Sequence, residues 1–432
     1  MNGGRLKIVF HTLGCKLNYT ETSAISRSFP ESRFERVMAD SKADIYVINT
    51  CSVTGAAEKK CRQAIKKFIH RSPGAFIAVT GCYAQLRPQD IAAIPGVDLV
   101  LGTNEKFDLV AYMKNLSKRD VPEVHSSELP ENQYCHPAFS VGDRTRSFLK
   151  VQDGCDYGCA YCTVPLARGN SRNQDIASLK GEAEKIAQTG TKEIVITGVN
   201  TGDFGKTTGE SFILLLKELI KVHGIERYRI SSIEPNLLTD EIIELIAEGN
   251  KLMPHLHIPL QSGSDRILGL MKRRYRREMF ERSILSVKEK IPLAGIGADV
   301  IVGFPGETDY DFEETYSFLR DMPLSYLHVF TYSARPGTVA YSMRDRTTFR
   351  VKEERSKRLI ALSEEKHLGF CRLNLGKISE VLFESGSRKM ITGFTENYLK
   401  AEHPCDYAMR GRIKKVLLKA VSASGNMTAE II

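Results

Sequence analysis

The sequence lacks two features that would place the protein in or across a membrane. No run of about 18 apolar residues occurs, so no membrane-spanning helix is expected. The first residues, MNGGRLKIVFHTLGC, also lack the layout of a signal peptide, because their apolar run is short and leads into a turn. We therefore expect a cytoplasmic protein with no membrane partner.

Acidic residues are fewer than basic ones, and the chain carries a net charge of +9. A positive excess favours a polyanionic partner, most simply a nucleic acid, although a merely basic surface is the alternative. The chain also has 10 cysteines. Structural disulfides are uncommon in a reducing cytoplasm, so this number favours metal or redox chemistry.

The length of 432 residues predicts two or three domains, and a hydrophobic fraction of 42% is that of an ordinary globular protein. Residues 1–115 alternate apolar runs (LKIVFHT, ADIYVINT, GAFIAVTG, VDLVLG) with amphipathic stretches such as GAAEKKCRQAIKKFIH. This pattern predicts a parallel α/β domain. Residues 116–146 are polar and lack a period, so we expect a linker there.

Residues 147–370 repeat a strand-then-helix unit, with strands expected at SFLKVQD, KEIVITG, RYRISSI, HLHIPL, GADVIVG and YLHVFTYS. Six such units predict a partial (βα)6 barrel related to the TIM barrel, with its site at the carboxyl ends of the strands. Residues 371–432 lose the helical period and predict a small antiparallel β-barrel.

Three cysteines, Cys155, Cys159 and Cys162, lie in a C-x-x-x-C-x-x-C run just past the first predicted barrel strand. Thiolates suit iron–sulfur clusters, and three of them on a four-iron cluster leave one iron free to bind a small molecule. A structural zinc site is the alternative, but it needs a fourth ligand. Cys135 and His136 are upstream, in the expected linker.

Three more cysteines, Cys15, Cys51 and Cys82, each follow a different predicted strand of the first domain. Because the carboxyl ends of parallel strands meet at one edge of a sheet, we expect these thiols to converge and to hold a second cluster. Scattered core cysteines are the alternative. The remaining four are expected to be structural or incidental: Cys61, Cys135, Cys371 and Cys405.

The arrangement of these motifs resembles the radical S-adenosylmethionine (SAM) methylthiotransferase family over nearly the whole chain. That family joins a three-cysteine α/β domain, a radical SAM barrel and an RNA-binding TRAM domain. The stretches TLGCKLNYTET and GCDYGCAYCTVPLARGNSR are most similar to the MtaB-type branch, which acts on N6-threonylcarbamoyladenosine in tRNA. Two other branches, acting on isopentenyladenosine in tRNA and on an aspartate of a ribosomal protein, remain alternatives.

The resemblance implies two [4Fe-4S] clusters and SAM. SAM would bind the free iron at Cys155, Cys159 and Cys162 and yield a radical, while the cluster at Cys15, Cys51 and Cys82 would take up sulfur. The product would carry a methylthio group on C2 of the adenine. The implied partners are a tRNA anticodon loop, an electron donor such as flavodoxin or ferredoxin, and a sulfur source. A non-catalytic RNA-binding protein with structural metal is a distant alternative.

The resemblance also implies SAM contacts at successive barrel strand ends, in TGVNTG, SSIEP, HIPLQSGSD and DVIVGFPGET. The residues concerned are Tyr161, Gly198, Asn200, Ser232, Glu234, Gln261 and Val302. Arg168 and Arg172 are expected to hold the SAM carboxylate or a substrate phosphate, unless they belong to a solvated loop. The basic run MKRRYRRE is either a contact for the tRNA backbone or an ordinary solvated helix face.

Overall fold

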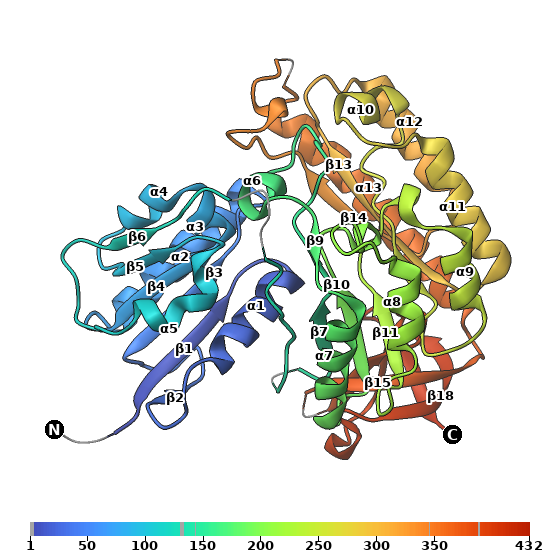
Figure 1. Cartoon of the computed structure of the whole chain (residues 1–432). Helices are drawn as coiled ribbons and strands as arrows, with labels where there is room; N and C mark the ends of the chain where they lie inside the picture. Colours follow the sequence, from blue (N-terminus) through green and yellow to red (C-terminus); the bar gives the residue numbers. More distant parts are fainter. Residues whose placement is uncertain (1–3, 130–133, 143, 345, 388) are drawn as a thin grey trace.

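Six parallel strands form the sheet of the first domain in the computed structural model, which describes residues 4–129, 134–142, 144–344, 346–387 and 389–432 (Figure 1). The order is β2-β1-β3-β4-β5-β6. The bounds are β1 Leu6–Thr12, β2 Phe34–Arg36, β3 Ile45–Thr50, β4 Phe76–Gly81, β5 Leu99–Leu101 and β6 Glu123–His125. The central strands β3 and β4 are buried at every position, as their apolar sequences predict for a sheet covered on both faces.

Helices cover both faces of this sheet and leave the carboxyl ends of the strands clear. They are α1 Lys16–Arg27, α2 Gly55–Arg71, α3 Cys82–Leu86, α4 Pro88–Ala92, η1 Glu105–Asp108 and α5 Leu109–Tyr112. Ile65 and Phe68 of α2 pack in one core cluster, and Ile25 of α1 packs in the cluster on the other face. The chain crosses from one face to the other between β1 and β3, which is where open α/β sheets bind their ligands.

The segment expected to be a linker contributes to this sheet. Strand β6, Glu123–His125, pairs with β5 in parallel register. The interpretation of 116–146 as linker alone is therefore wrong at this strand, because three half-polar residues are too few to show a period. Strand β2 escaped sequence analysis for the same reason.

The second domain is an open barrel of six parallel strands. Its two three-stranded sheets, β11-β10-β7 and β12-β13-β14, are joined by parallel bridges from Tyr228 to Leu252 and from Ser232 to His257. The strands are β7 Ser147–Lys150, β10 Glu193–Thr197, β11 Arg227–Ile230, β12 His255–His257, β13 Gly295–Val302 and β14 Tyr326–Thr331, with a side ribbon of β8 Gln152–Asp153 and β9 Arg172–Asn173. The predicted partial (βα)6 barrel is confirmed.

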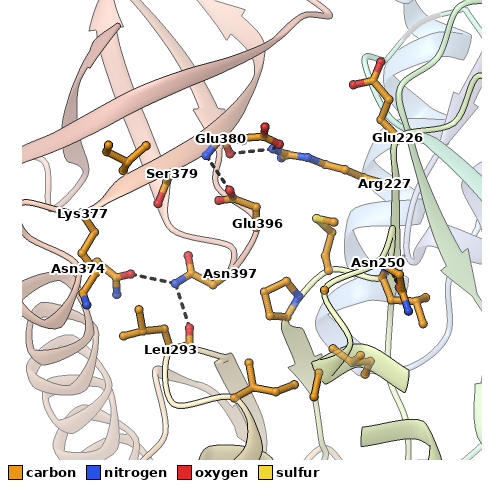
Figure 2. Close-up of a pocket in the computed structure, with 18 of the residues that line it drawn as sticks. Glu226, Arg227, Asn250, Leu293, Asn374, Lys377, Ser379, Glu380, Glu396 and Asn397 are labelled. Atoms are coloured by element: carbon orange, nitrogen blue, oxygen red, sulfur yellow. Dashed lines mark hydrogen bonds and ion pairs between the residues drawn. The ribbon is translucent and has the colours of Figure 1, made fainter. Parts of the chain in front are cut away.

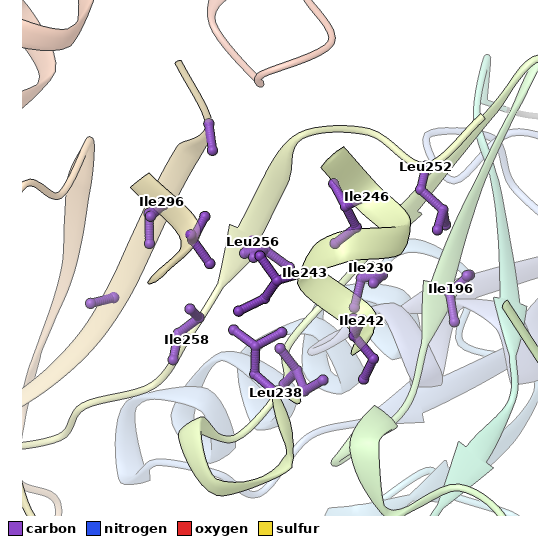
Figure 3. Packing of buried hydrophobic residues seen from close by; sticks show 14 of the residues in the cluster. Ile196, Ile230, Leu238, Ile242, Ile243, Ile246, Leu252, Leu256, Ile258 and Ile296 are labelled. Carbon is purple, nitrogen blue, oxygen red and sulfur yellow. The ribbon is translucent and has the colours of Figure 1, made fainter. Parts of the chain in front are cut away.

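Most helices of this domain lie on the outer face of the barrel, whereas α6 Val164–Arg168 packs beside α3 of the first domain. The other helices are α7 Ile176–Gln188, α8 Phe212–Leu219, α9 Asp240–Ala247, α10 Asp265–Leu270, α11 Arg277–Lys290, α12 Asp309–Asp321 and α13 Phe349–Leu373, with short turns η2 Thr201–Asp203, η3 Pro235–Leu237 and η4 Val339–Tyr341. Figure 3 shows isoleucines of α9 packing over apolar side chains of the strands.

Side-chain alternation along the strands gives the barrel a polar interior. Ile230 of β11, Leu256 of β12 and Val300 of β13 belong to the outer apolar core. Their neighbours point to the other side of the sheet, since successive strand residues alternate. These inward residues include Arg229, His257, Asp299 and His328. A closed TIM barrel fills this space with apolar side chains, so a polar interior indicates a binding site.

The last domain is a closed five-stranded barrel of order β15-β16-β17-β19-β18. Its elements are β15 Ile378–Gly386, β16 Met390–Phe394, β17 Lys400–Pro404, η5 Tyr407–Met409, β18 Ile413–Val421 and β19 Met427–Ile431. The predicted small barrel is confirmed; its pairings are antiparallel except that β17 and β19 run parallel. It docks on the large barrel through Arg229, which donates to the carbonyls of Thr395 and Glu396 at 3.2 and 2.9 Å.

The first domain packs against the open edge of the large barrel, where α1 lies beside β7. A second contact joins α2 to the loop after β14. There, Arg335 is ion-paired with Glu58, and the amide of Gly55 donates to the Ser333 hydroxyl at 3.0 Å. Among the described helices, none combines the length and apolar character required to cross a membrane.

Candidate active site between the first domain and the barrel

The structure brings the first predicted cysteine triplet to one edge of the sheet. Cys15 precedes α1, Cys51 follows β3, and Cys82 begins α3. Gly14, with φ of 109°, allows two of the loops to approach, since a Cβ there would lie 2.7 Å from the Cβ of Cys51. The three residues therefore flank the β1–β3 crossover, where this sheet order places a ligand.

Burial dominates the electrostatics of this triplet. Burial, reinforced by the neighbouring Cys82 and Cys15, raises the pKa of Cys51 to about 12. Burial also raises the pKa of Cys82, which the charge of Arg168 opposes. Such thiols stay protonated at neutral pH unless a metal takes the place of the protons.

The second triplet, Cys155, Cys159 and Cys162, lies in the loop after β8. The amides of Tyr157 and Val164 donate to the sulfurs of Cys155 and Cys162, each at 3.4 Å. Burial raises the pKa of Cys155 to about 11 and that of Cys162 to about 12. Amide donors directed at sulfur are the interactions that tune iron–sulfur clusters.

The sulfurs of each triplet are not gathered as closely as ligands of a single zinc ion. Among the described residues, neither cysteine triplet has its three Sγ atoms all within 4.8 Å of one another. Three thiolates on one tetrahedral zinc would lie about 3.8 Å apart, given a Zn–S bond of about 2.3 Å. Thiolates bound to separate irons are further apart, and the cluster expected at each triplet stays a prediction.

The residues predicted to contact SAM include unsatisfied buried polar groups. Both side-chain amide atoms of Asn200 are buried without a hydrogen-bond partner, as is the hydroxyl of Ser231, next to the predicted Ser232. Gly198 packs against the Gln152 amide, whose Oε1 accepts from the backbone amide of Asn200 at 2.9 Å. Orphaned polar atoms at the end of a strand suit a polar ligand.

Glu234 and Tyr161 both meet Arg273, a residue that sequence analysis did not single out. Arg273 is ion-paired with Glu234, and its Nη1 lies 3.1 Å from the Cys159 sulfur and 3.4 Å from the Tyr161 hydroxyl. Burial raises the pKa of Glu234 in spite of this arginine. Arg273 comes from the basic run MKRRYRRE, which we considered as an RNA contact or a solvated helix face. Because the Arg273 side chain is buried, neither interpretation applies to this residue.

Val302 ends β13, whereas Gln261 lies beyond the end of β12 and forms an isolated bridge with Val300. Gln261 adopts φ of 73°, which is uncommon for a non-glycine residue and concentrates at functional sites. The side chain of Val302 packs in the outer core, and its carbonyl accepts from the Tyr332 amide at 2.9 Å. A role of its backbone in the adenine pocket stays a prediction.

Arg168 and Arg172, predicted to bind SAM or substrate, lie in a buried ion-pair cluster. Arg168 Nη1 is 2.9 Å from both Glu21 Oε1 and Asp153 Oδ1, and Arg172 Nη2 is 3.2 Å from Asp153 Oδ2. Neither is on a solvated loop. Their donors are thus directed largely at protein groups, and substrate binding by either stays a prediction.

The polar interior of the barrel faces the first domain. His257, Asp299 and His328 offer side-chain atoms that all lie within 4.8 Å of one another. Lys16, next to Cys15, is exposed, yet the surrounding protein and two arginines lower its pKa to about 8. Sequence analysis missed this group because its members come from three strands and a helix of another domain.

A separate pocket of about 470 Å³ lies where the small barrel docks on the large one. Figure 2 shows Arg227, Glu380 and Glu396 among its lining residues. None of the predicted site residues lines it, so it is distinct from the site between the first domain and the barrel.

Comparisons with known proteins agree with this organisation. A family model described as the radical SAM superfamily matches residues 149–319, and one described as uncharacterized protein family UPF0004 matches residues 7–102. Threonylcarbamoyladenosine tRNA methylthiotransferase MtaB of Bacillus subtilis (strain 168) is 42% identical over 96% of this chain and 94% of its own length. The chain belongs to the radical SAM methylthiotransferase family.

Other members of this family match at similar coverage. A protein of the same name from Aquifex aeolicus (strain VF5) is 38% identical over 96% of this chain and 100% of its own length. A tRNA-2-methylthio-N(6)-dimethylallyladenosine synthase of Clostridium botulinum (strain Langeland / NCTC 10281 / Type F) is 32% identical over 87% of this chain and 86% of its own length.

Among solved structures, the radical SAM methyltransferase TsrM of Kitasatospora setae superposes with a TM-score of 0.54 at 13% identity. It covers 78% of this chain and 77% of that one. At this low identity, the likeness shows a similar fold and nothing more.

Proposed function

We propose that this protein adds a methylthio group to C2 of N6-threonylcarbamoyladenosine in the anticodon loop of tRNA. The observation that carries the proposal is that two cysteine triplets, on two domains, flank one polar interior. The similarity to relatives named for this activity, at 42% identity, supports the choice of substrate.

Two [4Fe-4S] clusters and SAM are the cofactors in this proposal. Bound at Cys155, Cys159 and Cys162, a cluster with SAM would supply a carbon-centred radical, and a second cluster at Cys15, Cys51 and Cys82 would supply the methylthio group. The fold and family support SAM and the first cluster. The convergence of the other three cysteines supports the second.

The protein's own residues would hold and align these groups. Asn200, Ser231 and Glu234 offer polar atoms for SAM, and Arg273 fixes Glu234 and Cys159. The ion pairs of Arg168 with Glu21 hold α1, and so Cys15, against the cluster loop. Fixing two reactive groups in one cleft turns an encounter into an intramolecular reaction.

The remaining partners follow from this chemistry. A reductant such as flavodoxin or ferredoxin would supply the electrons, and a separate sulfur source would renew the sulfur. The bases of an anticodon loop are single-stranded and accessible, so an enzyme can reach one adenine within it. Because the substrate is tRNA, we propose a cytoplasmic location.

Deletion of the gene followed by nucleoside mass spectrometry of total tRNA tests the proposal. We expect 2-methylthio-N6-threonylcarbamoyladenosine to disappear and its unthiolated precursor to accumulate. The wild-type gene and the control Cys405→Ala should restore the product, whereas Cys15→Ala should not. Cys405 lies in the small barrel, away from both triplets.

An unchanged level of that nucleoside would overturn the choice of substrate. The 32% identity to a dimethylallyladenosine synthase makes isopentenyladenosine the second candidate, and the same tRNA digest reports on it. The ribosomal aspartate is checked by mass spectrometry of ribosomal proteins from the same cells. A colourless protein containing zinc would instead favour the non-catalytic RNA-binding alternative.

A further inference from the structure

The barrel interior contains a hydrogen-bonded group that, among the described residues, has no hydrogen bond to either cysteine triplet. His257 Nε2 lies 2.8 Å from Asp299 Oδ1, and His328 Nδ1 lies 3.4 Å from the same oxygen. His328 is about half exposed, with 52% of its side chain accessible, and Asp299 keeps 23%. The second oxygen of Asp299 is therefore free to accept from a ligand.

This group adjoins the predicted SAM site, because His257 forms a parallel bridge with Ser232. The charge of Asp299 acts on Glu234, which is tied through Arg273 to the sulfur of Cys159. It also acts on Lys16, the residue after Cys15. Asp299 is thus within electrostatic reach of both sites, which is where the proposed function requires the reacting base.

Lys16 begins α1, the helix that packs beside β7 of the barrel, and its side chain is exposed. The charges of Arg146, Arg229 and Asp299 all act on the Lys16 ammonium group. Those arginines have acidic partners: Arg146 pairs with Glu384 at 2.5 Å, and Arg229 with Glu193 at 2.9 Å. In the described part of the chain, no hydrogen bond or ion pair occupies the Lys16 ammonium group, and its side chain is exposed.

The chemistry of the proposed substrate fits these two features. C2 and the N6 substituent of adenine flank N1 on the same edge of the base. Residues that bind the N6 substituent must therefore lie close to the place where C2 reacts, as Lys16 and Asp299 do. A threonylcarbamoyl group carries a carboxylate, a hydroxyl and ureido N–H groups, whereas an isopentenyl group has none of these.

Resting on the function proposed above, we infer that Lys16 and Asp299 select the threonylcarbamoyl group. The Lys16 ammonium binds its carboxylate, and Asp299, held by His257 and His328, accepts from its hydroxyl and ureido N–H groups. Both contacts are charge-assisted. An isopentenyl base makes neither of them, because it has no carboxylate and no hydrogen-bond donor on its N6 substituent. Lys16 and Asp299 are thus specificity residues, and the two histidines position Asp299.

The test uses the holoenzyme and three synthetic anticodon stem-loops, which carry threonylcarbamoyladenosine, its methyl ester or isopentenyladenosine. Binding is measured by fluorescence anisotropy, and kcat/KM for methylthiolation is measured separately. The wild type should bind the free acid about tenfold or more tightly than the ester, as expected for one charge-assisted hydrogen bond. Lys16→Met should lose this preference, and Lys16→Arg should keep most of it.

The roles of Asp299 and His328 are tested in the same assay. Asp299→Asn and His328→Ala should weaken binding of the free acid and of the ester alike, with unchanged affinity for the isopentenyl loop. Iron content and the visible spectrum check that both clusters remain loaded in every variant. Arg87→Met, an exposed change on the first domain, is the matched control for loss of a positive charge.

Several results would overturn this inference. If Lys16→Met weakens the acid and the ester equally, Lys16 contacts the RNA elsewhere, for example at a phosphate. If the wild type holds a metal ion beyond the irons of the clusters and His328→Ala releases it, the three residues form a metal site. If the wild type methylthiolates no threonylcarbamoyl loop at all, the proposed function itself fails, which is a different outcome.

Discussion

Arg168 of the barrel and Glu21 of the first domain form a buried ion pair, with Nη1 and Oε1 2.9 Å apart. The same guanidinium donates to Asn18 Oδ1 at 2.6 Å, and the amide of Asn18 donates to the carbonyl of Thr50, next to Cys51. Asn18 and Glu21 belong to TLGCKLNYTET, and Arg168 belongs to GCDYGCAYCTVPLARGNSR. The two stretches that resemble the family thus contact each other and fix the two cysteine triplets in one arrangement.

Removing this arginine should loosen the joint between the domains. Arg168→Met leaves Glu21 and Asp153 buried with fewer partners, and breaking a buried pair costs about 3–5 kcal/mol. Thermal unfolding followed by circular dichroism should show a clearly lower midpoint, with faster hydrogen exchange in α1. Arg87→Met, which removes an exposed pair with Asp90, should change stability by less than about 1 kcal/mol. Equal effects of the two substitutions would contradict this account.

The ion pairs of Glu21 should make stability depend on acid pH. Although burial opposes ionisation, Arg168, Lys106 and Lys150 lower the pKa of Glu21 from 4.5 to about 2. A lowered pKa stabilises the folded state above the unfolded pKa, and this contribution is lost as the pH falls from about 4.5 towards 2. Wild type and Glu21→Gln should therefore differ in unfolding free energy at neutral pH and converge in acid. Urea unfolding of both proteins across this range is the measurement, and a gap that widens in acid would refute the assignment.

Arg273 should govern SAM binding without being required for folding. Arg273→Met removes the counter-charge of Glu234 and a donor to the Cys159 sulfur, so we expect about tenfold or weaker SAM binding. The electron paramagnetic resonance signal of the reduced cluster should also change. Arg276→Met, in the same basic run but exposed, should bind SAM normally. Normal SAM binding by Arg273→Met would show that the ion pair has a purely structural role.

Local patterns in the sequence predicted most of the strands, because most are short runs of apolar residues, but they missed the half-polar strands β2 and β6. They also predicted the edge at which Cys15, Cys51 and Cys82 meet, because a parallel sheet fixes that edge. They failed where three-dimensional packing decides the outcome. Arg273 lies in a run of charges that resembles a surface helix, yet the turn after α10 directs it to Cys159.

The interior group of the barrel illustrates the same limit. His257, Asp299 and His328 are far apart in the sequence, and only the strand register places Asp299 opposite His328. Arg168 was predicted to bind SAM or substrate, and the structure pairs it with Glu21 and Asp153, so its predicted role stays a prediction. Its partner Glu21 could not be inferred, since the pair depends on how two separate domains dock.

Loss of Cys15 should stop methylthiolation while SAM cleavage continues. Cys15 is an exposed member of its triplet, so Cys15→Ala should remove the second cluster without disturbing the packing of the sheet. The iron content should fall from about eight to about four per chain, since each four-iron cluster is lost as a unit. SAM cleavage to 5′-deoxyadenosine should continue, while methylthiolation of the stem-loop stops. Cys155→Ala should abolish both activities. If Cys15→Ala keeps its full iron content or still forms the methylthio product, the first domain does not hold a cluster needed for the reaction.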